Sequence, residues 1–84
     1  MRYGTQTRLA PNDVLDRARA YFGPDGEVGL PLTQRDLRSV TFATDIGSVT
    51  VSVTPADEET EVTDVTILSL EFDYWAERFT RELH

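Results

Sequence analysis

The chain contains no cysteine, no lysine and a single histidine, and none of its apolar runs is long. Without cysteine, disulfide scaffolds, CxxC redox sites and thiolate zinc sites are excluded. No apolar stretch approaches the roughly 18 residues that a membrane-spanning helix requires, and residues 1–10 contain no apolar signal core. The sequence therefore predicts a cytoplasmic domain that does not act at a membrane.

Catalytic and cofactor motifs are also missing from the sequence. The sole histidine, His84, is the last residue, so no Ser-His-Asp set is available, and there is no GxGxxG fingerprint or P-loop. We therefore predict a protein that is not an enzyme and uses no cofactor and no metal. The basic residues are all arginines. Codon bias in a GC-rich bacterial genome explains this more simply than selection for bidentate contacts, for which the sequence offers no site.

The chain does contain enough apolar material for one small domain. Its 84 residues are 39% hydrophobic, and the apolar residues recur at regular spacing, which excludes a fully disordered chain. A chain of this length buries only about 60–65% of its unfolded surface. Either the core is efficient or an oligomer supplements it, and a homodimer is the oligomer that we expect.

The acidic residues are concentrated in the second half of the chain. The net charge is −7, and residues 39–77 contain nine acidic residues and no basic one. Nucleic acid is therefore not an expected partner, because a sheet that binds it presents basic and aromatic side chains. Any electrostatic partner of this half of the sheet is expected to be basic or metallic.

Two segments have the apolar spacing of helices that are buried on one side. Residues 11–22 begin with Pro11 at a favourable first position and are followed by Gly23 and Pro24, which end a helix. Residues 72–83 form the second helix, in which Glu77 and Arg81 are spaced as an ion pair. The stripes predicted to face the core are Val14, Leu15, Ala18, Tyr21 and Phe22 in the first helix and Phe72, Trp75, Ala76, Phe79 and Leu83 in the second.

Alternating residues predict five strands, over residues 2–8, 28–32, 38–44, 48–54 and 60–70. Pro31 makes the second strand an edge strand, and turns are expected at residues 33–37, 45–47 and 55–59. Gly47 suits a left-handed position in its turn. The last strand does not alternate cleanly, and a bulge near residues 64–66 would bring its apolar residues onto one face.

The element order β-α-β-β-β-β-α predicts an α+β fold in which two helices pack on one face of a curved antiparallel sheet. Residues 1–84 form a single domain. The order of elements resembles that of the TBP-like fold and of a reduced helix-grip fold.

Charged residues are expected to gather at the two ends of this sheet. Turns of a meander alternate between the ends, so Asp45 should lie near Glu71 and Asp73, without a base. These three are the candidates for binding a cation or a basic partner, although Asp73 also suits a helix start and Asp45 a turn. At the other end the expected neighbours are Arg35 and Arg38 with Glu58, Glu59 or Glu61.

Tyr21, Tyr74 and Trp75 are the candidate ligand or interface residues. Core packing accounts for most of the helix aromatics. Tyr74 lies off the apolar stripe, so we expect it to be exposed, and an exposed tyrosine on a small domain indicates an interface more than a pocket. The predicted function is a small non-enzymatic domain that acts through protein contacts, as a homodimer. The alternative is a domain that binds a small apolar or cationic ligand between helices and sheet.

Overall fold

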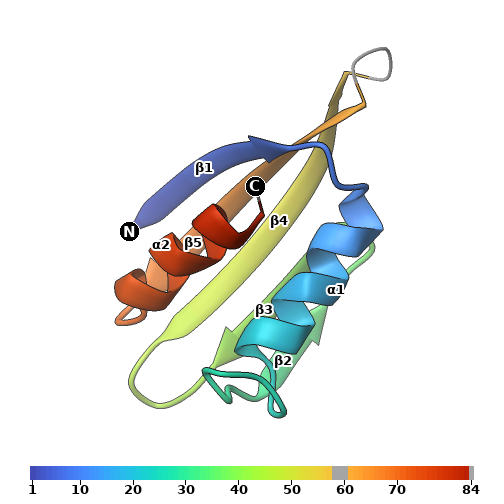
Figure 1. Ribbon diagram of the computed structural model, residues 1–84. Coiled ribbons are helices and arrows are strands. Elements are labelled where there is room, and N and C mark those ends of the chain that lie inside the picture. The colour runs from blue at the N-terminus through green and yellow to red at the C-terminus, as the bar shows by residue number, and fades with distance from the viewer. Residues whose placement is uncertain (58–60, 84) are drawn as a thin grey trace.

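The computed structural model describes residues 1–57 and 61–83, and Figure 1 traces the chain. The elements follow the predicted order, and the α+β class with an antiparallel sheet is confirmed. Their bounds are β1 Arg2–Thr7, α1 Pro11–Phe22, β2 Leu32–Arg35, β3 Ser39–Ala43, β4 Ser48–Asp57, β5 Val62–Leu70 and α2 Asp73–Glu82.

The strands form one five-stranded antiparallel sheet in the order β1-β5-β4-β3-β2, so the first strand pairs with the last. Both helices lie on the same side, α1 over β3 and β4, and α2 over β1 and β5 (Figure 1). Within the described residues, the other side of the sheet carries no helix, and neither helix is long and apolar enough to cross a membrane. We call the two sides the covered face and the open face.

α1 forms where the sequence predicts it because both of its ends are encoded locally. Pro11 occupies the first turn, where its missing N–H is not needed, and Asp13 faces the positive end of the helix dipole. The Gly23 N–H donates to the Arg19 carbonyl at 3.0 Å and closes the last turn. All residues of the predicted apolar stripe are buried.

The core fills the space between the helices and the covered face. The α2 stripe is confirmed, with Phe72 and Trp75 at its partly buried margin, and Glu77 and Arg81 form the predicted ion pair at 2.5 Å. The buried apolar residues of α2, its C-cap and the strands are Ala76, Phe79, Leu83, Val40, Phe42, Val49, Val51, Val53, Val65 and Ile67. Three polar strand residues, Thr7, Thr63 and Ser69, are buried as well.

The second strand lies at an edge of the sheet, as predicted, but its predicted bounds of 28–32 and the turn over 33–37 are wrong, because β2 spans Leu32–Arg35. The segment before β2 bonds instead to the end of α1. The N–H groups of Val28 and Leu30 donate to carbonyl oxygens in its last turn, at 3.1 and 2.7 Å. These donors are therefore not available to a neighbouring strand, and bonding to β3 begins with the Pro31 carbonyl, which accepts from the Ala43 N–H at 3.2 Å.

β5 contains no bulge within its paired residues, so the bulge predicted near residues 64–66 is wrong. The irregularity lies in β4, between Pro55 and Asp57, because proline cannot donate to the ladder. β4 also runs on to Asp57, beyond the predicted start of the turn. The residues of β5 alternate regularly: Thr63, Val65, Ile67 and Ser69 face the core, and Val62, Asp64, Thr66, Leu68 and Leu70 face the other way.

The turn between β3 and β4 meets the junction between β5 and α2 at one end of the sheet, as the meander predicts. A Cβ on Gly47 would collide with the Leu70 carbonyl oxygen and lie 2.9 Å from the Cβ of Glu71. The left-handed conformation predicted for Gly47 is wrong. Glycine is needed there because the two backbones approach too closely for a side chain. At the other end, the predicted neighbours of Arg35 and Arg38 include Glu58 and Glu59, which lie outside the described residues.

Small polar side chains dominate the open face. Strand pairing and alternation assign to it Arg2, Gly4, Gln6, Gln34, Ser39, Thr41, Ala43, Ser48, Thr50, Ser52, Thr54, Val62, Asp64, Thr66, Leu68 and Leu70. Two cross-strand contacts confirm the assignment. The hydroxyl oxygens of Thr41 and Thr50 lie 3.0 Å apart, and the Gln6 amide donates to Asp64 at 2.7 Å.

Candidate functional site on the second helix

Three side chains of α2 contact one another at the surface: Tyr74, Trp75 and Arg78. Helical spacing brings them together, because Arg78 follows Tyr74 by four residues and Trp75 by three. The Arg78 guanidinium carbon lies 5.8 Å from both ring centroids, and its Nη1 donates to the Tyr74 hydroxyl at 3.4 Å. That hydrogen bond is the main cause of the raised pKa of Arg78. A permanent positive charge is therefore held over the two rings.

Tyr21 connects this cluster to the core. The Trp75 ring lies edge-on to both Tyr74 and Tyr21, with centroids 5.0 and 6.3 Å apart. Tyr21 in turn lies 5.0 Å from Phe22 and 5.5 Å from Phe79. Tyr74 is 62% exposed and Tyr21 only 7%. The three aromatic candidates thus form one row from solvent to core, and the buried end restrains the exposed end.

The Tyr21 hydroxyl is buried and has no hydrogen-bond partner among the described residues. Burial raises the pKa of Tyr21, the negative charge of Glu82 raises it further, and Arg78 lowers it. The phenol therefore stays neutral at physiological pH. Its O–H donor and its acceptor lone pairs are not used by the described part of the protein.

Tyr74, Trp75 and Arg78, which we call the α2 cluster, have side chains suited to binding another protein. Tyrosine, tryptophan and arginine are the residue types that most often contribute the binding energy of protein interfaces. In this cluster they are already ordered by contacts with one another, so little side-chain entropy remains to be lost when a partner binds. Aromatic edges and a guanidinium suit an apolar side chain next to a hydrogen-bond acceptor.

The three acidic candidates lie at one end of the sheet, and all are exposed. Asp45 is in the turn between β3 and β4, and Glu71 and Asp73 are at the junction between β5 and α2. The Asp73 carboxylate lies 3.6 Å from the Met1 amino nitrogen, so the expected absence of a base is wrong for this residue. Across residues 1–57 and 61–83, no group of three or more His, Asp or Glu side chains is placed to hold a metal ion.

Glu71 has an unusual backbone conformation, with φ at 72°. Few residues other than glycine adopt this left-handed region. The conformation turns the chain from β5 into α2, and it directs the start of α2 back over β1. The sequence gives no sign of it, because glutamate is not a residue type that favours this region.

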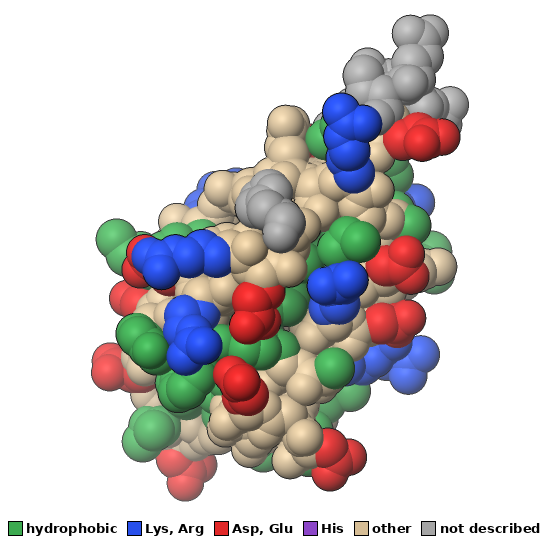
Figure 2. Space-filling model, in the orientation of Figure 1, with side chains coloured by type: hydrophobic (Ala, Val, Ile, Leu, Met, Phe, Trp, Pro, Cys, Tyr) green, Lys and Arg blue, Asp and Glu red, His purple; other side chains and the backbone are tan. Residues whose placement is uncertain are grey.

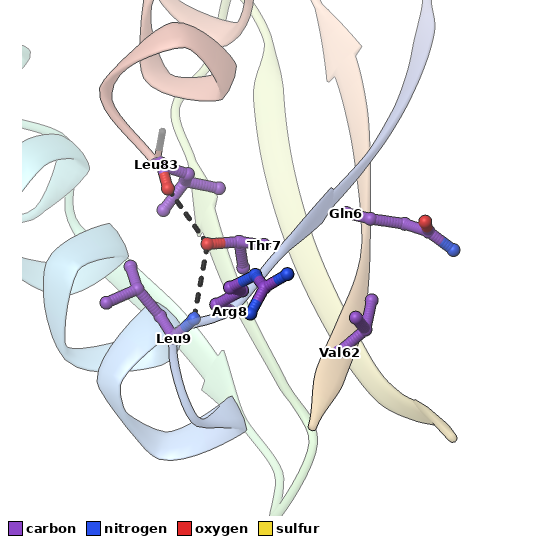
Figure 3. A pocket seen from close by; sticks show the side chains of 6 residues that line it. All are labelled: Gln6, Thr7, Arg8, Leu9, Val62 and Leu83. Atoms are coloured by element: carbon purple, nitrogen blue, oxygen red, sulfur yellow. Dashed lines mark hydrogen bonds between the residues drawn. The ribbon is translucent and has the colours of Figure 1, made fainter. Parts of the chain in front are cut away.

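Two of the open hollows in the surface adjoin Leu83, at the end of α2. The smaller, ≈ 190 Å³, separates the helices and is lined by Arg17, Tyr21, Phe79 and Glu82, among others. The larger, ≈ 540 Å³, lies where β1 leads into α1 (Figure 3). The residues lining it are Gln6, Thr7, Arg8, Leu9, Val62 and Leu83, and the Thr7 hydroxyl donates to the Leu83 carbonyl at 2.8 Å.

Arg78 is the member of the cluster that the sequence analysis missed. Its spacing from Tyr74 and Trp75 could have indicated the contact. An arginine on a helix surface is usually solvated, however, so the spacing alone does not distinguish it. The structure adds the geometry that distinguishes it, since one guanidinium lies over two rings.

Arginine and acidic side chains are interspersed over the side of the molecule that carries the helices (Figure 2). The α2 cluster is therefore not part of a large field of one sign. Comparison of the chain with protein-family models, with curated proteins and with solved structures finds no match.

Proposed function

We propose that the protein is a small non-enzymatic domain that acts through protein contacts, with Tyr74, Trp75 and Arg78 as a contact site. The observation that carries this proposal is the Arg78 guanidinium stacked over two rings, one of them 62% exposed. The exposed part of the Tyr74 ring contributes little to folding, whereas a partner that covered it would remove apolar surface from water.

The partner that fits is a protein segment with an apolar side chain beside a carboxylate or a backbone carbonyl. The apolar side chain would pack against the edge of the Tyr74 ring. The carboxylate or carbonyl would accept from the Arg78 guanidinium, whose fork of N–H groups suits paired oxygen acceptors.

A photo-reactive amino acid at position 74 tests the proposal in the cells that make the protein. We expect a defined cross-linked product that is lost when Arg78→Ala is added. The matched control carries the same group at Leu37, which is 83% exposed in the turn between β2 and β3. Equal cross-linking from both positions, or none from position 74, would contradict the proposal. Thermal unfolding of Arg78→Ala checks that the fold is intact.

A second candidate function is the binding of a small apolar ligand in the hollow beside Thr7. Its size of ≈ 540 Å³ falls in the range of small-molecule sites, about 300–1,000 Å³. Arg8 lines this hollow, which disfavours a cationic ligand there. Saturable binding of the dye 8-anilinonaphthalene-1-sulfonate that Leu9→Glu abolishes would support this function; binding that is unchanged in the variant would oppose it.

The order of elements supports a TBP-like or reduced helix-grip fold without nucleic-acid binding. Among the described residues, the open face has a single basic side chain, Arg2, and no aromatic one. Phosphate recognition requires several basic groups, and base stacking requires aromatic rings. The absence of cysteine supports a cytoplasmic location as part of the proposal.

A further inference from the structure

The end of β5 has its side chains in the reverse of the usual arrangement. Ser69 is 3% exposed and faces the core, whereas its neighbours Leu68 and Leu70 are 51% and 65% exposed on the open face. The Ser69 hydroxyl is buried without a partner among the described residues. An antiparallel sheet with one solvated face normally directs apolar side chains inward and polar ones outward. The reversal lowers stability on both faces, which points to a use for the leucines beyond the fold of one chain.

The two leucines border a hollow on the open face. Its volume is ≈ 480 Å³, and Met1, Ser48 and Thr50 also line it. Beyond the hollow, about half of the residues of the face are serine or threonine, and Gly4 and Ala43 are smaller still. Side chains this small allow a second sheet to approach to the usual spacing of about 10 Å. The shape of the face is therefore suited to another sheet.

The charge of the open face is balanced although the chain is acidic. Among the residues of β4 up to Thr54 and the open-face residues of the strands paired with them, the charged ones are Arg2 and Asp64, which have opposite signs, whereas the net charge of the chain is −7. Three of the acids of residues 39–77, Asp45, Glu71 and Asp73, lie at one end of the sheet, as expected, and not across its open face.

The size of the open face is sufficient for a modest interface. The nine residues of β5 span roughly 30 Å, and five strands span roughly 20 Å. Because β2 and β3 are shorter, the projected area is on the order of 500 Å². A standard interface buries about 800 Å² of accessible surface on each partner, and a pleated surface exceeds its own projection.

We infer that a second copy of this chain covers the open face, sheet against sheet, with Leu68 and Leu70 as part of the contact. The leucines and the hydroxyl side chains of the face offer little that a strongly basic or acidic partner would bind. In a dimer, the leucines of one copy would pack against those of the other, and the serine and threonine side chains of the two copies would face each other. This interface is independent of the α2 cluster, which lies on the covered side of the sheet.

Sedimentation equilibrium of the purified chain between about 1 and 500 µM tests the inference. We expect a monomer–dimer equilibrium in the micromolar range, as suits an interface of this size. Leu68→Asp should weaken the dimer at least tenfold, because an unpaired carboxylate would be buried in the contact. Leu37→Asp is the matched control, since it adds the same charge at an exposed position off the face, and it should leave the equilibrium unchanged.

Three results would overturn the inference. The first is a folded wild-type chain that stays monomeric throughout the concentration range. The second is a dimer that Leu68→Asp and Leu70→Asp both leave intact. The third is a dimer that Arg78→Ala disrupts and Leu68→Asp does not, which would assign the contact to the α2 cluster. Circular dichroism of each variant establishes that it is folded, and both leucines are exposed enough for this to be expected.

Discussion

The two faces of this sheet differ in burial and in residue type, although they share the same strands. On the covered face of β4, Val49, Val51 and Val53 are at most 1% exposed. On the open face of the same strand, Ser48, Thr50 and Ser52 are only partly covered by their neighbours. Burial dictates the residue types of the covered face and leaves those of the open face free. Departures from a simple polar surface on the open face therefore carry information about function.

Substitutions at neighbouring positions of β4 should show the largest difference in stability between the two faces. Val51→Asp places an unpaired carboxylate in the core, and we expect a loss of several kcal/mol, comparable with the whole stability of a domain of this size. Thr50→Asp, one residue away on the open face, should cost about 1 kcal/mol through lower strand propensity. Urea unfolding followed by circular dichroism, at a concentration below dimerisation, measures both. Equal losses would mean that the open face is buried within the single chain.

Two glycines show whether the backbone, like the side chains, is more crowded in one part of the molecule than on the open face. Gly47→Ala should destabilise the fold by about 1–3 kcal/mol, because its Cβ would collide with the carbonyl of Leu70 and force the turn away from α2. A Cβ on Gly4, on the open face, meets nothing within 4 Å. Gly4→Ala should therefore stabilise the chain by about 0.4–1 kcal/mol, since alanine restricts the unfolded state.

Thermal and urea unfolding of the two variants provide the measurement. If Gly4→Ala destabilises the chain as much as Gly47→Ala does, the open face is more crowded than the sheet geometry indicates.

The helices could be predicted because their signals are local. Pro11, Gly23 and the apolar stripes fix α1 and α2 without reference to the rest of the chain. The second strand could not be placed from the sequence, because the bonds of Val28 and Leu30 to the end of α1 are tertiary. Alternation alone cannot tell a strand from an extended segment that bonds to a helix.

The error in β5 has a different cause. Assuming that all its apolar residues are buried required a bulge near residues 64–66. The actual strand keeps its regular alternation and exposes Leu68 and Leu70. In the same way, spacing identified Tyr74 and Trp75 as candidates, but the position of Arg78 over their rings depends on rotamers that no sequence pattern encodes.

Ser69→Ala tests how much stability the chain loses by directing a serine of β5 into the core. The variant removes a buried hydroxyl that has no partner in the described part of the chain, so we expect stabilisation of about 1 kcal/mol. Ser52→Ala is the control on the open face, where the hydroxyl can reach solvent, and its effect should stay within about 0.5 kcal/mol. Loss of stability in Ser69→Ala would show that the hydroxyl makes a hydrogen bond in solution, and the reversal would then need no functional explanation.

The smallest expected effect is confined to alkaline solution and concerns Tyr21 on the covered side. Burial raises the pKa of Tyr21 above its ordinary value of 10.0. Below pH 10 the folded and unfolded states both keep the phenol proton. Above pH 10 the unfolded chain loses it first, so stability falls as the pH rises through the folded pKa. Tyr21→Phe should remove this contribution, and the difference in melting temperature between the variant and the wild type should widen above pH 10. A constant difference from pH 7 to 11 would mean that the Tyr21 hydroxyl is solvated in the folded protein.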